Sequence, residues 1–265
     1  PVVLGAIALR NADELVKKLE TMGASEKAAE LDELATRVID PYLIIVAVLV
    51  VLAGVIFYSS LPEIDTEAED ETVAAANAKK KSIIQFPHLL MGTLAMFFYI
   101  GVEVIAGDTV ISYGMSLGFD SATAKFFTTY TLVAMIIGYL IGIVAIPKYL
   151  NQQKALGISA ILGIVFGLGA IFTSGFTSVL LIALLGLANA LVFPAIWPLA
   201  LSGLGRFTKI GSSFLIMAIA GGAILPLAYG YLADNLNPQQ AYWIVIPCYL
   251  YILFFAVKGH KIRAH

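Results

Sequence analysis

Two carboxylates lie inside one continuous apolar stretch of the chain, LLMGTLAMFFYIGVEVIAGDTVISY, which covers residues 89–113. An ionised acid at the centre of a membrane helix costs about 2.5–3.5 kcal/mol, so such acids normally face a polar partner or a water-filled site. Glu103 lies near the centre, with Tyr99 one helical turn before it and Gly107 one turn after it. We predict that Glu103 and Tyr99 bind a small polar ligand. The alternative is a hydrogen bond from Glu103 to a neighbouring helix.

The second carboxylate, Asp108, has a different position on the same helix. It follows Glu103 by five residues, or about 140° around the axis, so the two acids do not form a catalytic pair. It also lies closer to the predicted outer interface of the membrane. We predict that Asp108 contributes to a gate or a proton path, with an interfacial acid reached by water as the alternative.

A buried amide is the next candidate. Asn189 lies near the middle of the apolar stretch 178–200. A buried amide must be hydrogen-bonded, and the sequence leaves open whether its partner is a ligand or another helix. Pro194 and Pro198 follow it, and each removes a backbone hydrogen bond, which predicts a bend in this helix.

Weaker signals come from one tyrosine and several glycines. Tyr130 is included among the substrate-binding candidates because tyrosine offers an aromatic face to a ligand. Gly221 and Gly222, followed by a proline, predict a second bend. The pairs Gly138/Gly142 and Gly163/Gly167 have the spacing that favours close contact between membrane helices.

The remaining chemistry-bearing residues argue against an enzyme. The three histidines, His88, His260 and His265, lie at span ends or in the tail, and Cys248 is the single cysteine. The chain has neither an HExxH nor a GxSxG motif. We therefore expect no catalytic residues, no metal site, no cofactor and no nucleic-acid partner.

The composition of the chain indicates that these residues are held by membrane-spanning helices. The 265 residues are 60% hydrophobic and only 13% charged, with a mean hydropathy of +0.90. Soluble domains have about 45–50% apolar and about 25% charged residues. The apolar runs are continuous rather than alternating, which predicts an all-α polytopic membrane protein in a lipid bilayer. Seven segments are long enough to span it: 41–61, 88–113, 122–147, 155–173, 177–200, 210–233 and 241–258.

The distribution of basic residues predicts the orientation of these spans. Ten lysines and arginines fall on one side of the last six spans, and only Lys125 falls on the other. The ten are Lys79, Lys80, Lys81, Lys148, Lys154, Arg206, Lys209, Lys258, Lys261 and Arg263. Because cytoplasmic loops are enriched in basic residues, we expect the C-terminus to be cytoplasmic.

The order of the segments predicts four parts. Residues 1–61 are predicted to end a first helical bundle, with an outer loop at 10–40 and a span at 41–61. A charged cytoplasmic linker follows at 62–87, then a six-helix bundle at 88–258 and a cytoplasmic tail at 259–265. The chain opens on PVVLGAIAL without Met, as if cut inside an earlier span, which predicts a fragment lacking most of the N-terminal bundle.

Three stretches carry a resemblance to a known family. They are FFYIGVEVIAG (97–107), GLANALVFPAIWPLALSGLGRFTKIGSSFLIMAIAGGAILPLAYGYLAD (186–234) and DPYLIIVAVLVVLAGVIFYSSLPEI (40–64). Together they resemble the fucose/glucose/galactose:proton symporter family of the major facilitator superfamily.

The resemblance implies twelve spans in two six-helix bundles, alternating access, and uptake of a hexose-type sugar with a proton as the coupling ion. By it, this chain holds a major-facilitator-like six-helix bundle plus the last helix or so of the preceding bundle. Glu103 and Asn189 then fall in cavity-lining spans. The family's proton-coupling acids belong to the first bundle, so we expect the fragment to be inactive alone.

The resemblance also implies location in the inner membrane of a bacterium. A sugar suits the candidate residues, because a carboxylate accepts bonds from hydroxyls, an amide donates and accepts, and tyrosine offers a ring face. The superfamily usually has a glycine–basic pattern in the inner loop between spans eight and nine. This chain departs from it, with Tyr139 after Gly138 and basic residues only at Lys148 and Lys154. The alternative function is a seven-span receptor or another membrane module without transport activity.

Overall fold

The computed structural model describes residues 23–59, 73, 77 and 80–262. The predicted stub of an earlier span, the start of the outer loop and most of the 62–87 linker lie outside these residues. The described part is built from helices, with no strand among them. The chain divides into two compact units, residues 1–65 with 120–126 and residues 66–119 with 127–265.

The first unit contains α3 (Ala24–Tyr58) and the short α7 (Ser121–Ala124). The sequence predicts a boundary at Pro41, but α3 continues through it from Ala24. Proline removes a single N–H, so it leaves the carbonyl four residues earlier without its helical partner and the rest of the ladder intact. Residues 24–40, which belong to the predicted outer loop, are therefore helical and continuous with the predicted span.

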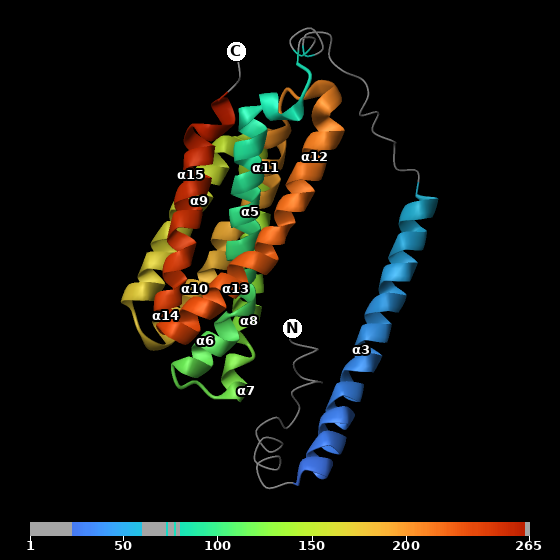
Figure 1. Cartoon of the computed structure of the whole chain (residues 1–265), viewed down its shortest axis with the longest axis vertical. Helices are drawn as coiled ribbons and strands as arrows, with labels where there is room; N and C mark the ends of the chain where they lie inside the picture. The colour runs from blue at the N-terminus through green and yellow to red at the C-terminus, as the bar shows by residue number, and fades with distance from the viewer. Residues whose placement is uncertain (1–22, 60–72, 74–76, 78–79, 263–265) are drawn as a thin grey trace. The chain divides into compact units, whose positions relative to one another are not determined.

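The second unit is a bundle of helices whose long axes run in broadly the same direction (Figure 1). Its longer elements are α5 (Pro87–Asp108), α8 (Phe127–Lys148), α9 (Gln152–Phe172), α10 (Gly175–Asn189), α11 (Val192–Leu201), α12 (Thr208–Met217), α13 (Gly221–Asn235) and α15 (Val245–Val257). Two short α-helices, α6 (Val110–Ser116) and α14 (Pro238–Ala241), lie at one end. Single turns of 3₁₀-helix occur at η1 (Ile83–Gln85), η2 (Gly205–Phe207), η3 (Ala218–Ala220), η4 (Tyr242–Ile244) and η5 (Gly259–Lys261).

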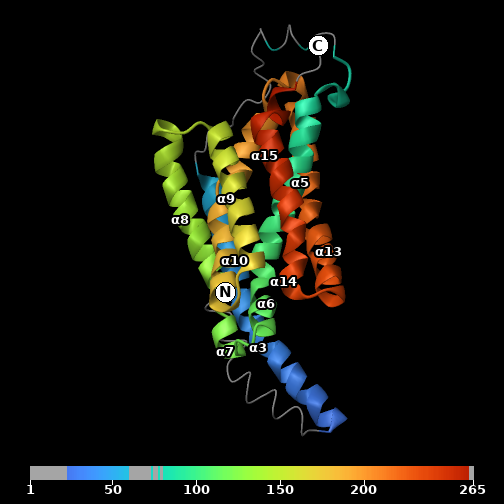
Figure 2. The same cartoon turned by 90° about the vertical axis from the view of Figure 1, so that its left-hand side faces the viewer.

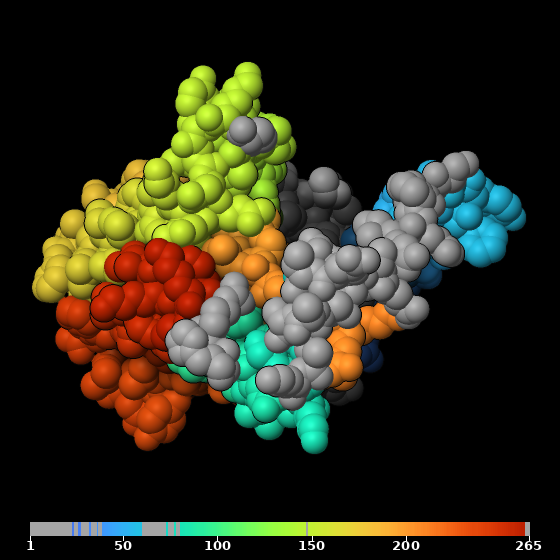
Figure 3. All heavy atoms as spheres, turned by 90° about the horizontal axis from the view of Figure 1, so that it is seen from above, coloured from blue at the N-terminus to red at the C-terminus, as the bar shows by residue number. Residues whose placement is uncertain are grey.

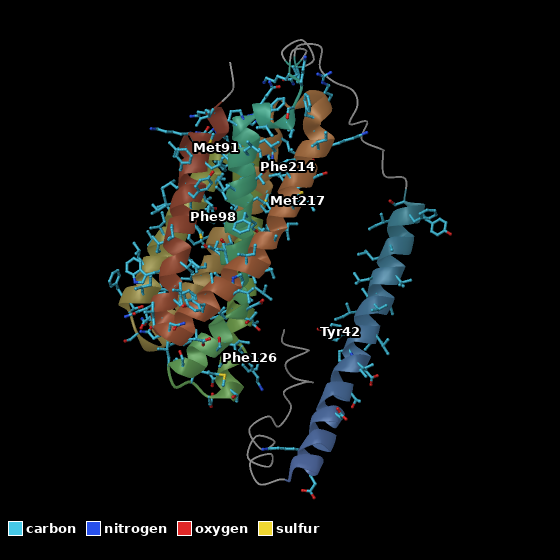
Figure 4. All side chains as sticks on the ribbon, in the orientation of Figure 1. Tyr42, Met91, Phe98, Phe126, Phe214 and Met217 are labelled. Carbon is cyan, nitrogen blue, oxygen red and sulfur yellow. The ribbon has the colours of Figure 1, made fainter. Side chains whose placement is uncertain are left out.

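Several of the predicted spans correspond to more than one element. The predicted span 88–113 is α5 and the start of α6, 177–200 is α10 and α11, and 210–233 is α12, η3 and α13. Seven described helices are long and apolar enough to cross a membrane, as predicted. Large apolar side chains remain exposed along them; Met217, labelled with Phe214 on α12 in Figure 4, is 70% exposed. A bilayer covers such side chains, so the chain is an integral membrane protein.

Within the bundle, α8 and α13 form opposite flanks, with α5, α9, α10 and α15 between them (Figure 2). The predicted glycine contacts are confirmed. A Cβ at Gly138 on α8 would lie 2.6 Å from the Cβ of Ala190, beside α10. On α9, Gly163 faces the ring of Tyr249. Glycine removes the side chain that would otherwise hold these helix pairs apart.

Side-chain amides form hydrogen bonds to backbone carbonyls at both ends of the bundle. At one end, the Gln239 amide donates to the carbonyls of Ala170 (3.0 Å) and Ile171 (3.2 Å), which occupies acceptors in the last turn of α9. The opposite end, where α5 begins and α15 ends, is seen in Figure 3. There the Asn77 amide donates to the Gly203 carbonyl at 2.9 Å, so this residue of the predicted linker is bonded to the loop after α11.

Candidate functional site

Tyr99 and Glu103 occupy adjacent turns of α5, as their spacing predicts. Tyr99 is buried and Glu103 is half-buried. The Tyr99 hydroxyl lies close enough to the Glu103 carboxyl group for an electrostatic interaction. A carboxylate has more acceptor sites than one hydroxyl can occupy, so Glu103 retains capacity for a ligand.

Asn189 is the last residue of α10 and has an exposed fraction of 0%. Its Oδ1 accepts a hydrogen bond of 2.9 Å from the hydroxyl of Tyr249, a buried residue of α15. Its Nδ2 group is buried and has no hydrogen-bond partner in the structure. Such a group is costly unless a partner arrives, and a ligand is one way to supply it.

Tyr249 lies near both Asn189 and Glu103. It lies close enough to Glu103 for an electrostatic interaction, and so does Tyr139 of α8. The cluster therefore consists of Tyr99, Glu103, Tyr139, Asn189 and Tyr249, from four different helices, and we call it the polar cluster.

Aromatic rings extend the polar cluster toward α11. The rings of Tyr99 and Phe193 are 6.3 Å apart at 60°, and those of Phe193 and Trp197 are stacked 5.6 Å apart at 21°. The interruption between α10 and α11 lies at Ala190 and Leu191, four and three residues before Pro194. Pro194 has no N–H for the Ala190 carbonyl, so the break falls where the proline predicts a bend, directly after Asn189.

Two predicted site residues lie apart from the polar cluster. Tyr130 is 42% exposed, with its ring 6.0 Å from that of Phe127. It precedes Tyr139 by nine residues, about 13 Å along the axis of α8. Asp108 is exposed and is the last residue of α5. Substrate contact by Tyr130 and a gating role for Asp108 stay predictions.

The predicted bend at Gly221 and Gly222 coincides with a change of helix type. Residues 218–220 form a 3₁₀ turn, and α13 begins at Gly221 with Pro226 inside it. A Cβ at Gly221 would collide with the backbone carbonyl of Phe97 on α5. Close approach of two backbones thus accounts for glycine at this position.

Sequence reasoning missed Tyr139 and Tyr249 as members of the polar cluster. Each lies in an apolar span without an acid or amide on the same face, and only the packing of α8 and α15 brings them near Glu103. Among the residues that the structure describes, no group of three or more His, Cys, Asp or Glu could hold a metal. The polar cluster offers a carboxyl group, an amide donor, hydroxyls and ring faces, a set suited to a small uncharged ligand with several hydroxyls.

Comparison with known proteins identifies sugar transporters as homologues. A glucose/galactose transporter of Brucella abortus biovar 1 (strain 9-941) is 34% identical over 224 residues, which is 83% of this chain and 53% of the relative. A putative glucose/galactose transporter of Helicobacter pylori (strain ATCC 700392 / 26695) is 32% identical, over 91% of this chain and 60% of the relative. The L-fucose-proton symporter of Escherichia coli (strain K12) is 28% identical, over 90% and 55%.

Solved structures agree with these relatives. The crystal structure of the major facilitator superfamily transporter FucP in the outward conformation has a TM-score of 0.71 at 26% identity, covering 91% of this chain and 59% of that one. A second structure of the E. coli fucose:proton symporter has a TM-score of 0.73 at 25% identity, covering 94% and 64%. No family model matches the chain. The chain spans about half the length of the curated relatives it matches, 53–60% of each.

These findings confirm the resemblance drawn from the sequence. The chain has the fold of the corresponding part of a major facilitator transporter, and its relatives are transporters rather than enzymes. The alternative of a seven-span receptor or another module without transport activity is not favoured.

Proposed function

Starting from homology to major facilitator sugar transporters, we propose that the protein takes up a hexose-type sugar together with protons by alternating access. The substrate belongs to the fucose, glucose or galactose class, which the names of the relatives support. Protons as the coupling ion are supported by the name of the L-fucose-proton symporter of E. coli and by the likeness to the solved E. coli fucose:proton symporter.

The observation that carries the proposal is the polar cluster inside a bundle of apolar helices. A sugar presents hydroxyls that donate to the Glu103 carboxyl group and accept from the Asn189 amide. Its C–H face can lie against rings such as those of Tyr99 and Phe193, which approach each other at 60°. No lysine or arginine lies within residues 82–124 or 155–205, which contain Glu103 and Asn189. An uncharged sugar therefore suits the polar cluster better than an anion.

Alternating access requires a second bundle of helices opposite this one. We propose that the N-terminal bundle is the partner of residues 88–258, and that α3 is the last helix of that bundle. We further propose that the proton-coupling acids lie in the N-terminal bundle and that Glu103 serves mainly in sugar binding. By the distribution of basic residues, residues 62–87 and the C-terminus face the cytoplasm of a bacterium, with the protein in its inner membrane.

Transport by the purified full-length protein tests this function. The protein is reconstituted in liposomes that are alkaline inside and acidic outside, and uptake of labelled D-glucose, D-galactose and L-fucose is followed. We expect at least one sugar to accumulate above equilibrium and a protonophore to abolish the accumulation. Absence of uptake of all three sugars, compared with protein-free liposomes, would refute the proposed function.

A further inference from the structure

The amide of Asn189 has a fixed orientation in the structure. Its Oδ1 accepts from the Tyr249 hydroxyl at 2.9 Å, while its buried Nδ2 has no partner among the residues that the structure describes. Rotation of the amide by 180° would let the hydroxyl oxygen accept from the amide N–H, but the hydroxyl's own hydrogen and the amide oxygen would then lose their mutual hydrogen bond inside the protein. Because an unpaired buried donor is costly, the tyrosine favours the orientation that leaves the amide N–H available to a ligand.

Packing holds Tyr249 itself in place. The residue is fully buried, and its ring lies against Gly163 of α9, where any larger residue would collide with ring carbons. Glycine at this point lets the ring lie directly on the helix backbone, so the position of the hydroxyl is set by two helices, α9 and α15.

From these contacts we propose that Tyr249 is a positioning residue that sets sugar specificity. It turns the Asn189 amide so that the N–H group points to the substrate and donates to one hydroxyl oxygen of the sugar. The inference rests on the proposed function, sugar transport, and adds a residue and a role to it. Tyr249 acts through Asn189 and need not touch the sugar itself.

The polarity of this contact has a consequence for recognition. A site that hydrogen-bonds a substrate hydroxyl discriminates against the analogue lacking it, because the buried donor is then left unpaired. One deoxy analogue should thus bind the wild-type protein more weakly than the parent sugar does. Without the Tyr249 hydroxyl, the amide is free to turn, and the penalty for that analogue should fall.

The experiment uses the full-length protein in proteoliposomes and a series of monodeoxy analogues of the transported sugar as inhibitors of uptake. Tyr249→Phe removes only the hydroxyl. Tyr251→Phe, on the same helix, is the matched control, because its hydroxyl lies at 3.5 Å from the Met91 carbonyl and outside the polar cluster. Asn189→Asp is a second variant, which keeps an acceptor for Tyr249 but has no N–H. Thermal melting in detergent checks that each variant is folded.

We expect Tyr249→Phe to weaken binding of the parent sugar by about five- to tenfold, the order of one hydrogen bond. The measured quantity is the ratio of the inhibition constant of each deoxy analogue to that of the parent sugar. For one analogue this ratio should fall toward unity in both Tyr249→Phe and Asn189→Asp, and stay unchanged in Tyr251→Phe. If the folded variants keep the wild-type pattern of deoxy penalties while uptake persists, the positioning role is refuted and the transport function stands. If Tyr249→Phe does not fold, an unchanged pattern of discrimination in Asn189→Asp still refutes the proposal, because the amide would then make no contact with the sugar. If the wild-type protein transports none of the sugars, the proposed function fails instead.

Discussion

Glu103 is the residue whose role separates sugar binding from proton coupling most clearly. It is half-buried in the polar cluster and lies close enough to the Tyr99 hydroxyl for an electrostatic interaction. Glutamine at this position keeps the shape and the hydrogen-bonding capacity but cannot titrate. We expect Glu103→Gln in the full-length protein to weaken sugar affinity by about 0.5–1.5 kcal/mol, the net contribution of one neutral hydrogen bond.

External pH is recorded when sugar is added to de-energised cells that carry the full-length protein. Sugar exchange is measured in parallel. Sugar-driven proton uptake should persist in the Glu103→Gln variant. If the proton signal disappears while exchange stays intact, Glu103 is the coupling group and the two roles are reversed.

The sequence predicted part of the polar cluster and missed the rest for a physical reason. Glu103 and Asn189 were found because an acid or an amide in an apolar span needs a partner, and Tyr99 because it lies one turn from Glu103. Tyr139 and Tyr249 gave no such signal, since tyrosine is tolerated in membrane helices without a specific partner. Their place depends on which helices pack together, and the periodicity of a single span does not specify this.

The helices themselves followed the apolar pattern closely, and the differences arise at proline and glycine. The break after Asn189 precedes Pro194, whereas Pro41 lies inside the continuous α3. A proline weakens a helix wherever it occurs, and surrounding packing decides whether the helix is interrupted. This is why the sequence predicts a weak point more reliably than a helix boundary.

For the packing of the helices, two glycines of α13 provide a matched pair of variants. A Cβ at Gly221 would meet the backbone of Phe97, while a Cβ at Gly230 meets nothing within 4 Å. We expect Gly221→Ala to destabilise the protein by about 1–3 kcal/mol through overpacking. Gly230→Ala should be neutral or stabilising by up to about 1 kcal/mol.

Thermal melting of the full-length protein in detergent measures both variants. Equal melting temperatures for Gly221→Ala and Gly230→Ala would show that α5 and α13 are not in the close contact that the structure describes.

The orientation of the whole molecule in the membrane is a separate prediction. Ten basic residues lie on one side of the last six spans and one on the other, which predicts that the 62–87 linker and the tail are cytoplasmic. We expect a cysteine introduced by Ser82→Cys, in a cysteine-free variant, to resist an impermeant maleimide in intact cells and to react after permeabilisation. Labelling of this cysteine from outside would reverse the orientation of all the spans.

The central claim is that the polar cluster is the sugar-binding site of a transporter, and a structure of the full-length protein with bound sugar tests it most directly. We predict that sugar oxygens lie within hydrogen-bond distance of the Glu103 carboxyl group and the Asn189 Nδ2, and that both side chains face one cavity. A sugar bound elsewhere, or either side chain directed into lipid, would contradict the claim.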